Sequence, residues 1–357
     1  MSNGHSGVHD ISIDRLKHWL VEHNEKVSLE YSSPDAAFLR RQYRANHKTE
    51  VIAFECMDGR INLSLMSETP LGIVQSVRNL GGIFNLGWFY LNEMLDDLVG
   101  YAIKHGRDCL AFVTYHWSRG DLHRGCRGHN YDKDVARTDM MHLTHQIEEI
   151  FGVKHSVVYP ICLGIETDED AFLFHGFEGR TLDVSTLRDQ DQDELRIKLM
   201  ELYPDMKKQV LDDLLPIVEG NIRHVAKVRA MNRQILDAHH RERIMAIGRG
   251  LEWLHVNNLA LIVGPFDPNL DAAVEVAMKL LLGNIESKRI PQDGIILLAS
   301  ETYRDPAGSD RPGAVVKSRF ARDFALKTIE LAVPSLRELV IPMACVVDVN
   351  TRKFHLI

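Results

Sequence analysis

The sequence predicts an α/β protein with mostly parallel sheets, because short apolar runs alternate with segments of helical periodicity. The chain has 357 residues, of which 45% are hydrophobic and 26% charged, a composition typical of a folded protein with a full core. The alternation occurs twice, once before residue 186 and again after residue 255. We therefore expect two α/β modules in one chain.

Four regions are expected from these changes of pattern. The chain should begin with helices, since Ile13, Leu16 and Leu20 share one helical face and a second, polar helix is expected after Pro34. Between the modules the sequence is charged and favours helix. The regions are a helical arm at 1–50, an α/β module at 51–186, a helical connector at 187–255 and a second α/β module at 256–357.

Apolar runs flanked by glycine or polar residues predict buried strands, and apolar residues three and four apart predict helices. Leu91, Leu95 and Leu98 form one such helical stripe, which should end near Gly106. In the first module the expected strands are 51–54, 73–77, 109–115, 157–165 and 171–174, and the expected helices are 88–105 and 135–151. Beyond it we expect helices at 195–203, 231–251, 270–282 and 318–332, and strands at 259–263, 294–299 and 339–349, the last of them followed by the segment 353–357.

The second half of the sequence repeats features of the first at a constant separation. Pro160 and Pro342 lie 182 residues apart (342 − 160). One offset shared by separated segments favours an ancient internal duplication, the alternative being two unrelated halves whose elements fall in step. The same offset pairs Phe172 with Phe354, Gly82 with Gly264, Phe84 with Phe266 and Leu98 with Leu280.

Bulk properties exclude several classes of function. A formal net charge of −8 argues against general nucleic-acid binding. Residues 1–10 lack the apolar segment of a signal peptide, and no run approaches the roughly 18 apolar residues that cross a bilayer. We therefore expect a cytoplasmic protein without a membrane partner. The cysteines are too few, and odd in number, for a disulfide framework. They are Cys56, Cys109, Cys126, Cys162 and Cys345.

A candidate chemical site begins at Cys56-Met57-Asp58-Gly59-Arg60, directly after an expected strand. Functional groups of open α/β sheets gather at such strand ends. The Asp58 carboxylate and the Arg60 guanidinium can form a bidentate pair. On its own this pattern is weakly specific, because a buried cysteine beside a surface ion pair would look the same.

A histidine and another cysteine follow the next expected strand. His116 ends the strand, and Cys126 lies ten residues further on. Two cysteines and one histidine suit tetrahedral zinc with an open fourth position, the arrangement of catalytic centres. A fourth protein ligand, for which His123, His129 and Asp58 are candidates, would instead give a closed structural site.

Taken in order, these features resemble the β-class carbonic anhydrases. That family carries Cys-x-Asp-x-Arg, then Arg-Asn-x-Gly, a helix, a strand, and a histidine and cysteine. Here Cys56 to Arg60 is followed by Arg78-Asn79-Leu80-Gly81-Gly82 and by the remaining features, over roughly residues 50 to 165. The resemblance implies two β-carbonic-anhydrase-like modules and the reversible hydration of carbon dioxide to bicarbonate by zinc-bound hydroxide. Asp58 would orient the hydroxide and Arg60 would hold Asp58 away from the metal.

The resemblance also implies which residues bind zinc. Cys56 and Cys126 supply the thiolates. For the imidazole we prefer His116, because it stands where the family's ligand emerges from its strand, with His123 as the alternative because His123-x-x-Cys126 has the common family spacing. Choosing His116 inserts a loop before Cys126, which is similar to the carboxysome-shell branch of the class.

The shell branch also carries a degenerate second copy of the catalytic fold, in agreement with the repeat. The segment 163–171 is similar to a stretch of those enzymes. Beyond residue 255 the sequence has only Cys345, paired by the offset with Leu163 rather than with a ligand. The second module should therefore lack metal ligands, giving one zinc ion per chain.

The remaining expectations concern the pocket and partners. Arg78, Asn79, Gly81 and Gly82 should shape a pocket loop, while His123, His129, His142 and His145 are candidates for proton transfer. His47 stands where many family members have a glutamine that binds substrate, so carbon disulfide and carbonyl sulfide are alternative substrates. A zinc-stabilised binding or scaffold protein is the non-enzyme alternative. Family members often form homo-oligomers, whereas the sequence does not support association with a carboxysome.

Overall fold

The protein is an α/β protein with two mostly parallel sheets flanked by helices, as the sequence predicts. This computed structural model describes residues 7–151, 157–188, 192–231 and 240–357. The chain divides into two compact units. The six-stranded unit comprises Phe38–Cys56 and Ile61–Ala238, and the five-stranded unit comprises Met1–Ala37, Met57–Arg60 and His239–Ile357.

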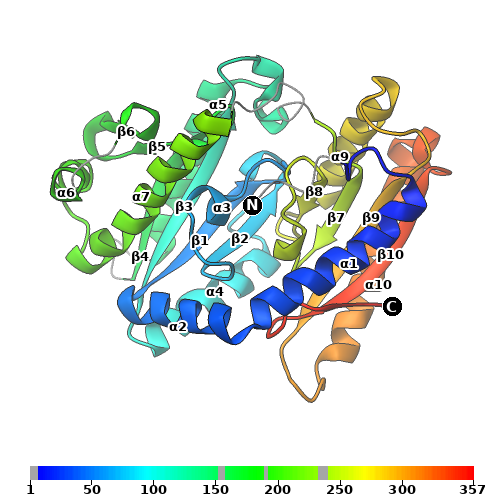
Figure 1. Cartoon of the computed structure of the whole chain (residues 1–357), viewed down its shortest axis with the longest axis horizontal. Helices are drawn as coiled ribbons and strands as arrows, with labels where there is room; N and C mark the ends of the chain where they lie inside the picture. The colour runs from blue at the N-terminus through cyan, green and yellow to red at the C-terminus, as the bar shows by residue number, and fades with distance from the viewer. Residues whose placement is uncertain (1–6, 152–156, 189–191, 232–239) are drawn as a thin grey trace. The chain divides into compact units, whose positions relative to one another are not determined.

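The sheet of the six-stranded unit has the order β2-β1-β3-β4-β5-β6 (Figure 1). Its first four strands pair in parallel, and β5 and β6 are added antiparallel. The central strands are buried along nearly their whole length, which explains their continuous apolar runs. The strands are β1 (Thr49–Cys56), β2 (Val74–Asn79), β3 (Asp108–Trp117), β4 (Val158–Glu166), β5 (Ala171–His175) and β6 (Thr181–Asp183).

Helices α4, α5 and α7 pack against this sheet. The stripe predicted on α4 is confirmed for Leu91 and Leu95, which are buried, whereas Leu98 is half-buried and its neighbour Val99 is buried instead. The helices of this unit are α3 (Leu63–Met66), α4 (Phe89–Lys104), α5 (Lys133–Phe151), α6 (Gln192–Leu202) and α7 (Lys208–Met231), and the division between the units falls within α2 (Pro34–Asn46).

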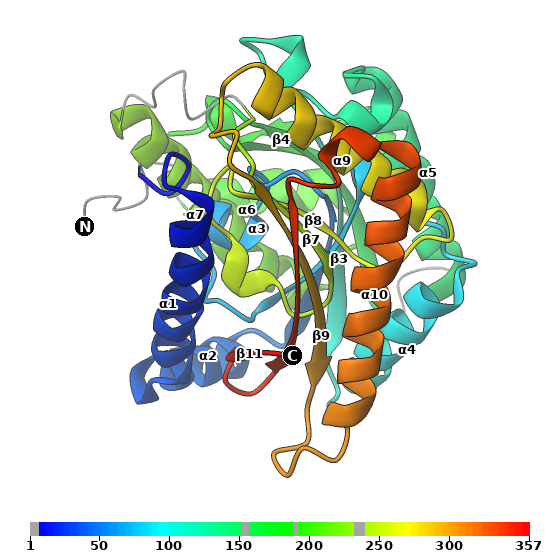
Figure 2. The same ribbon diagram turned by 90° about the vertical axis from the view of Figure 1, so that its right-hand side faces the viewer.

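The sheet of the five-stranded unit has the order β11-β10-β9-β7-β8, with parallel pairing except between β10 and β11. Helices α1 (Ile13–Ser32) and α10 (Arg311–Ala332) lie on opposite faces of it (Figure 2). Leu16 and Leu20 of α1 enter the core of this unit. The other elements are α9 (Leu270–Glu286), β7 (Ile244–Gly248), β8 (Ala260–Val263), β9 (Ile295–Tyr303), β10 (Val340–Asp348) and β11 (Phe354–Leu356).

The sequence prediction of a single helix at 231–251 is wrong. The helix expected at 231–251 contains the strand β7, and its residues 232–239 lie outside the described part of the chain. The apolar core of β7 is only four residues long between charged neighbours, so pairing with β8 and β9 outweighs local helix propensity. The expected connector at 187–255 is likewise divided, because α6 and α7 belong to the six-stranded unit and β7 to the other. The expected arm at 1–50 is divided too, with α1 in the five-stranded unit.

In the part of the chain that the structure describes, no helix has the length and the apolar character needed to cross a bilayer.

Candidate metal centre

Three of the predicted ligands lie together in the six-stranded unit. Cys56 is the last residue of β1, and His116 is the penultimate residue of β3. These strands are parallel neighbours, so their carboxyl ends lie side by side. Cys126 follows in the loop before the 3₁₀ turn Arg127–His129. One ligand atom from each of the three residues lies within 4.8 Å of the others, and all three side chains are buried.

The chemistry of this set fits zinc. Thiolate and imidazole are the ligands that zinc prefers, and three of them leave one tetrahedral position open. Two sulfurs bound tetrahedrally at about 2.3 Å lie about 3.8 Å apart. The Sγ atoms of Cys56 and Cys126 are 3.9 Å apart, and neither cysteine forms a disulfide. The residues are therefore spaced as a shared metal ion requires.

The structure separates the two histidines that the sequence left as alternatives. His116 is buried beside the cysteines. His123 is on the loop surface, where its side chain is 81% exposed and its Nδ1 lies 3.3 Å from Asp121 Oδ1. His123 does not belong to the clustered set.

Arg78 braces the backbone that carries Cys56. Its buried guanidinium donates a hydrogen bond of 3.1 Å to the Cys56 carbonyl and another to the Ile61 carbonyl. It also forms an ion pair of 3.2 Å with Glu55, which is completely buried. Asn79 closes the next turn by donating from Nδ2 to the Ile83 carbonyl at 2.7 Å. The predicted pocket loop is thus a support for the first ligand.

The glycines of this loop allow it to approach the other two ligand segments. Gly82 has a φ of 69°, and a Cβ there would lie 2.9 Å from the carbonyl oxygen of Thr114, two residues before His116. Gly81 packs on Gly128, where a Cβ would lie 2.6 Å from the Gly81 Cα. Side chains at these positions would push apart the segments that hold His116 and Cys126.

His129 contacts the candidate ligand Cys126. Its Nδ1 lies 3.4 Å from Cys126 Sγ, and its Nε2 lies 3.1 Å from Asp139 on α5. Burial lowers the pKa of His129, although the Asp139 carboxylate acts in the opposite direction. Such histidine–carboxylate pairs orient groups around metal ligands. The sequence analysis identified His129 as a candidate site residue but not Asp139. Asp139 lies beside the buried stripe of α5, and no spacing in the sequence distinguishes it from other polar residues of that helix.

The predicted catalytic pair forms within the five-stranded unit. Arg60 donates from Nε and Nη2 to the two Asp58 carboxylate oxygens, at 3.0 and 2.6 Å. The Arg60 backbone N–H adds a third hydrogen bond of 2.9 Å. Both side chains are buried, so this bidentate pair fixes the orientation of the carboxylate.

His240 and Glu242 extend this pair, and the sequence reading missed them because they fall in the segment read as helix. Glu242 is completely buried and lies 2.9 Å from His240 Nδ1, while His240 Nε2 lies 3.4 Å from Arg60 Nη2. Burial disfavours the imidazolium, yet the adjacent Glu242 carboxylate raises the pKa of His240 overall. Asp58, His240 and Glu242 are spaced like metal ligands. The positively charged Arg60 guanidinium already pairs with Asp58 and lies beside His240, so this group contains its own cation.

The other predicted histidines lie elsewhere. His142 and His145 are exposed on α5, where His145 contacts Glu148 and Glu149. His47 precedes β1, at the end of the strand opposite Cys56, and its Nδ1 lies 3.2 Å from Asp213. None of the three lies in the clustered set.

Comparison of the chain with protein-family models and with curated proteins found no match.

Proposed function

We propose that this chain is a zinc enzyme that reversibly hydrates carbon dioxide to bicarbonate, as the β-class carbonic anhydrases do. The convergence of Cys56, His116 and Cys126 in one buried cluster carries the proposal. Donor types and sulfur spacing support zinc with an open fourth position. The Cys-x-Asp-x-Arg and Arg-Asn-x-Gly-Gly segments favour the β-class reaction over other zinc chemistry.

Zinc bound by these three residues would act as a Lewis acid and lower the pKa of a water molecule toward neutrality. Asp58 follows Cys56 by two residues, so their Cα atoms are at most about 7 Å apart. At this reach the Asp58 carboxylate would accept a hydrogen bond from the attacking water and orient it toward carbon dioxide. Arg60 engages both oxygens of Asp58 and so opposes its use as a fourth ligand.

We further propose that the five-stranded unit is a degenerate copy of the catalytic fold. Its strand order matches that of the six-stranded sheet up to β5. The chain would then hold one zinc ion. A cytoplasmic location and assembly into homo-oligomers belong to the same proposal.

The proposal is tested by measuring zinc content and stopped-flow carbon dioxide hydration on the same purified sample. We expect about one zinc ion per chain together with hydration activity. Asp58→Asn should keep zinc and lower kcat/KM by about 10²–10⁴-fold, because the amide cannot replace the oriented acceptor. The matched control is Asp183→Asn, which replaces a carboxylate on β6. This variant should retain parental activity.

Other results would redirect the assignment. Hydration at the parental rate in Asp58→Asn would contradict the role of the carboxylate. Zinc without hydration from neutral to alkaline pH would favour carbon disulfide or carbonyl sulfide, measured on the same samples, or a non-catalytic binding role. If the protein contains no zinc after purification and takes up none when zinc is added, the proposed ligand set is wrong.

A further inference from the structure

The loop between the candidate ligands His116 and Cys126 has little regular structure of its own. Residues 118–121 form neither helix nor strand, and only the short 3₁₀ turn Leu122–Arg124 follows. Arg119, Leu122 and His123 are exposed. A loop of this kind cannot hold two ligands in register unless other segments anchor it.

The anchor is the turn Glu166–Asp170 between β4 and β5, within the segment 163–171 that the sequence singled out. Thr167 donates from its backbone N–H to the Trp117 carbonyl at 2.8 Å, directly after His116. The completely buried Glu166 accepts from the Arg119 N–H at 3.1 Å. Asp168 N–H and Glu169 N–H also donate to Glu166, which fixes the turn itself.

Asp168 makes the most contacts with the loop. Its carboxylate accepts hydrogen bonds of 2.8 Å from Ser118 Oγ and 2.8 Å from the Gly120 N–H. It also pairs with the Arg124 guanidinium at 3.6 Å, two residues before Cys126. One side chain thus holds the beginning and the end of the loop.

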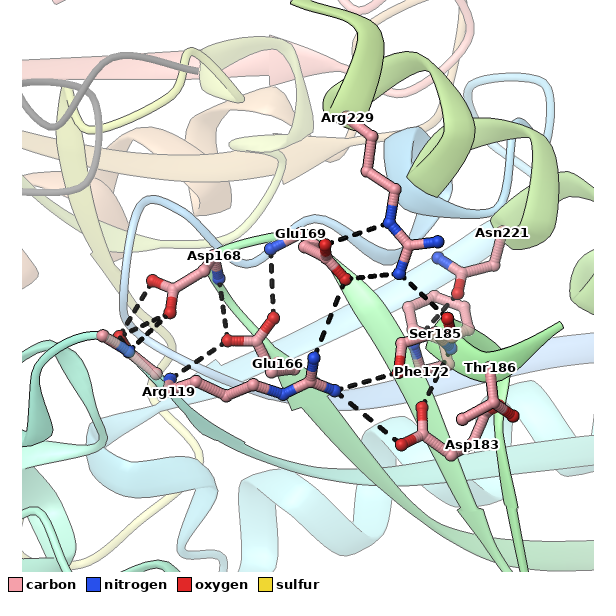
Figure 3. A network of polar contacts seen from close by, with 12 residues as sticks. Arg119, Glu166, Asp168, Glu169, Phe172, Asp183, Ser185, Thr186, Asn221 and Arg229 are labelled. Atoms are coloured by element: carbon pink, nitrogen blue, oxygen red, sulfur yellow. Dashed lines mark hydrogen bonds and ion pairs between the residues drawn. The ribbon is translucent and has the colours of Figure 1, made fainter. Parts of the chain in front are cut away.

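A second layer of charge holds the turn in place. Arg229 of α7 binds both oxygens of Glu169, and Arg119 pairs with Glu169 at 3.8 Å (Figure 3). Asp183 lies outside this layer and meets the half-exposed end of the Arg119 side chain. On the far side of the turn, Asp170 pairs with His224 of α7 at 2.9 Å. The turn is therefore tied to α7 as well as to the sheet, which makes it a rigid support.

We propose that the acidic turn Glu166–Asp170 is a positioning element for the metal centre, with Asp168 as its main contact. Through the loop it sets how firmly His116 and Cys126 hold the metal. This inference rests on the proposed zinc site and deepens it, since residues that orient metal ligands typically change metal affinity by about 10–100-fold when removed.

The test compares Asp168→Ala, Asp168→Asn and the matched control Asp183→Ala. Asp183 lies beside the same charged groups, but its carboxylate contacts the Arg119 side chain and accepts from the Ser185 N–H of its own turn rather than from the loop backbone. The measured quantity is the rate at which the zinc-loaded protein loses zinc to excess chelator. We expect release about 10–100-fold faster for Asp168→Ala, an intermediate rate for Asp168→Asn because one acceptor oxygen remains, and the parental rate for Asp183→Ala.

Two further readouts separate positioning from a general loss of structure. The visible spectrum of the cobalt-substituted protein should change in Asp168→Ala and stay parental in Asp183→Ala. Thermal unfolding of the metal-free protein should be alike in these two variants. Parental zinc release and a parental cobalt spectrum in Asp168→Ala would overturn the inference, as would faster release that merely follows a lower unfolding temperature of the metal-free form.

The two proposals fail in different ways. If the parental protein takes up neither zinc nor cobalt, the proposed function is wrong and this inference falls with it. If the parental protein binds metal and Asp168→Ala behaves like Asp183→Ala, only the positioning role is wrong.

Discussion

The two sheets have the same strand order but carry different side chains where the candidate metal ligands stand. In the six-stranded unit the order is β2-β1-β3-β4-β5, followed by β6, and in the five-stranded unit it is β8-β7-β9-β10-β11. Parallel and antiparallel pairings agree at every step. The two sheets therefore share one strand order, and among the described residues the cluster of two thiols and an imidazole lies in the six-stranded unit.

Strand register shows which residues correspond. β4 and β10 are equally long and 182 residues apart (340 − 158). Ile165 of β4 pairs with His116, and the corresponding Val347 pairs with Thr302. By the same reasoning across the next strand, Phe54 of β1 corresponds to Ile247 of β7. Cys56 therefore corresponds to Arg249.

The five-stranded unit thus has arginine and threonine at the positions that correspond to two candidate ligands. Arg249 forms an ion pair of 2.8 Å with Glu301. The two sheets therefore show that strand order fixes only the position of a site. A few side chains, and the loops that hold them, decide whether a metal can bind there.

The largest effect is expected from replacing the candidate ligand Cys56 of the six-stranded unit. Cys56→Ser should abolish stoichiometric zinc binding and all hydration activity, because a serine hydroxyl is a poor zinc ligand at neutral pH. Cys345→Ser is the matched control, a buried cysteine of the five-stranded sheet. It should retain zinc. Metal analysis after dialysis checks both variants, and zinc retained by Cys56→Ser would refute the ligand assignment.

Many strands and helices of both units could be predicted from the sequence because their periodicities are strong. The buried stripe of α4 and the continuous apolar runs of β3 and β4 leave little choice. β7 could not be read, since its short apolar run is recognisable only beside β8 and β9.

The candidate site was predictable to a similar extent. Cys56 and His116 lie at the ends of their strands and Cys126 in the loop that follows, and these positions led to their choice together with the resemblance to the β-class carbonic anhydrases. The contacts of Asp139 with His129 and of Asp168 with Ser118 depend on side chains that meet only after folding. No spacing in the sequence marks such contacts.

A second prediction concerns the loop that separates the ligand segments. Gly82→Ala should lower the free energy of unfolding by about 1–3 kcal/mol, since alanine is strained at a φ of 69° and its Cβ would crowd the Thr114 carbonyl oxygen. Gly100→Ala, on α4 with open space around it, is the control and should be neutral or stabilising. Denaturant unfolding monitored by circular dichroism measures both, and equal effects would contradict the packing argument.

A third prediction concerns the pH dependence of the acidic turn in the six-stranded unit. Burial, together with the Asp168 carboxylate, raises the pKa of Glu166 from 4.5 to about 7. A carboxyl group with a raised pKa favours the folded state when protonated, so this stabilisation is lost as pH rises from about 4.5 through about 7. The charged groups around it are Asp168, Glu169, Asp183, Arg119 and Arg229.

Glu166→Gln imitates the protonated carboxyl and does not titrate. The unfolding free energy of this variant relative to the parent should therefore increase between about pH 4.5 and 7 and level off above that range. Denaturant unfolding of the metal-free proteins at a series of pH values measures the difference. A difference that is independent of pH would show that the pKa of Glu166 is not raised in the folded protein.

The smallest expected effect concerns the position in the second copy that corresponds to Cys56. Arg249→Ala removes a partly exposed ion pair with Glu301, and such pairs contribute about 0–1 kcal/mol. Glu301 still accepts a hydrogen bond of 2.8 Å from the Thr302 N–H, so its carboxylate is not left without a donor. Zinc content should stay at the parental value. If Arg249→Ala instead lowered zinc content as Cys56→Ser does, the two copies would not be separable in function, and the second sheet would have to be counted as part of the metal-binding machinery.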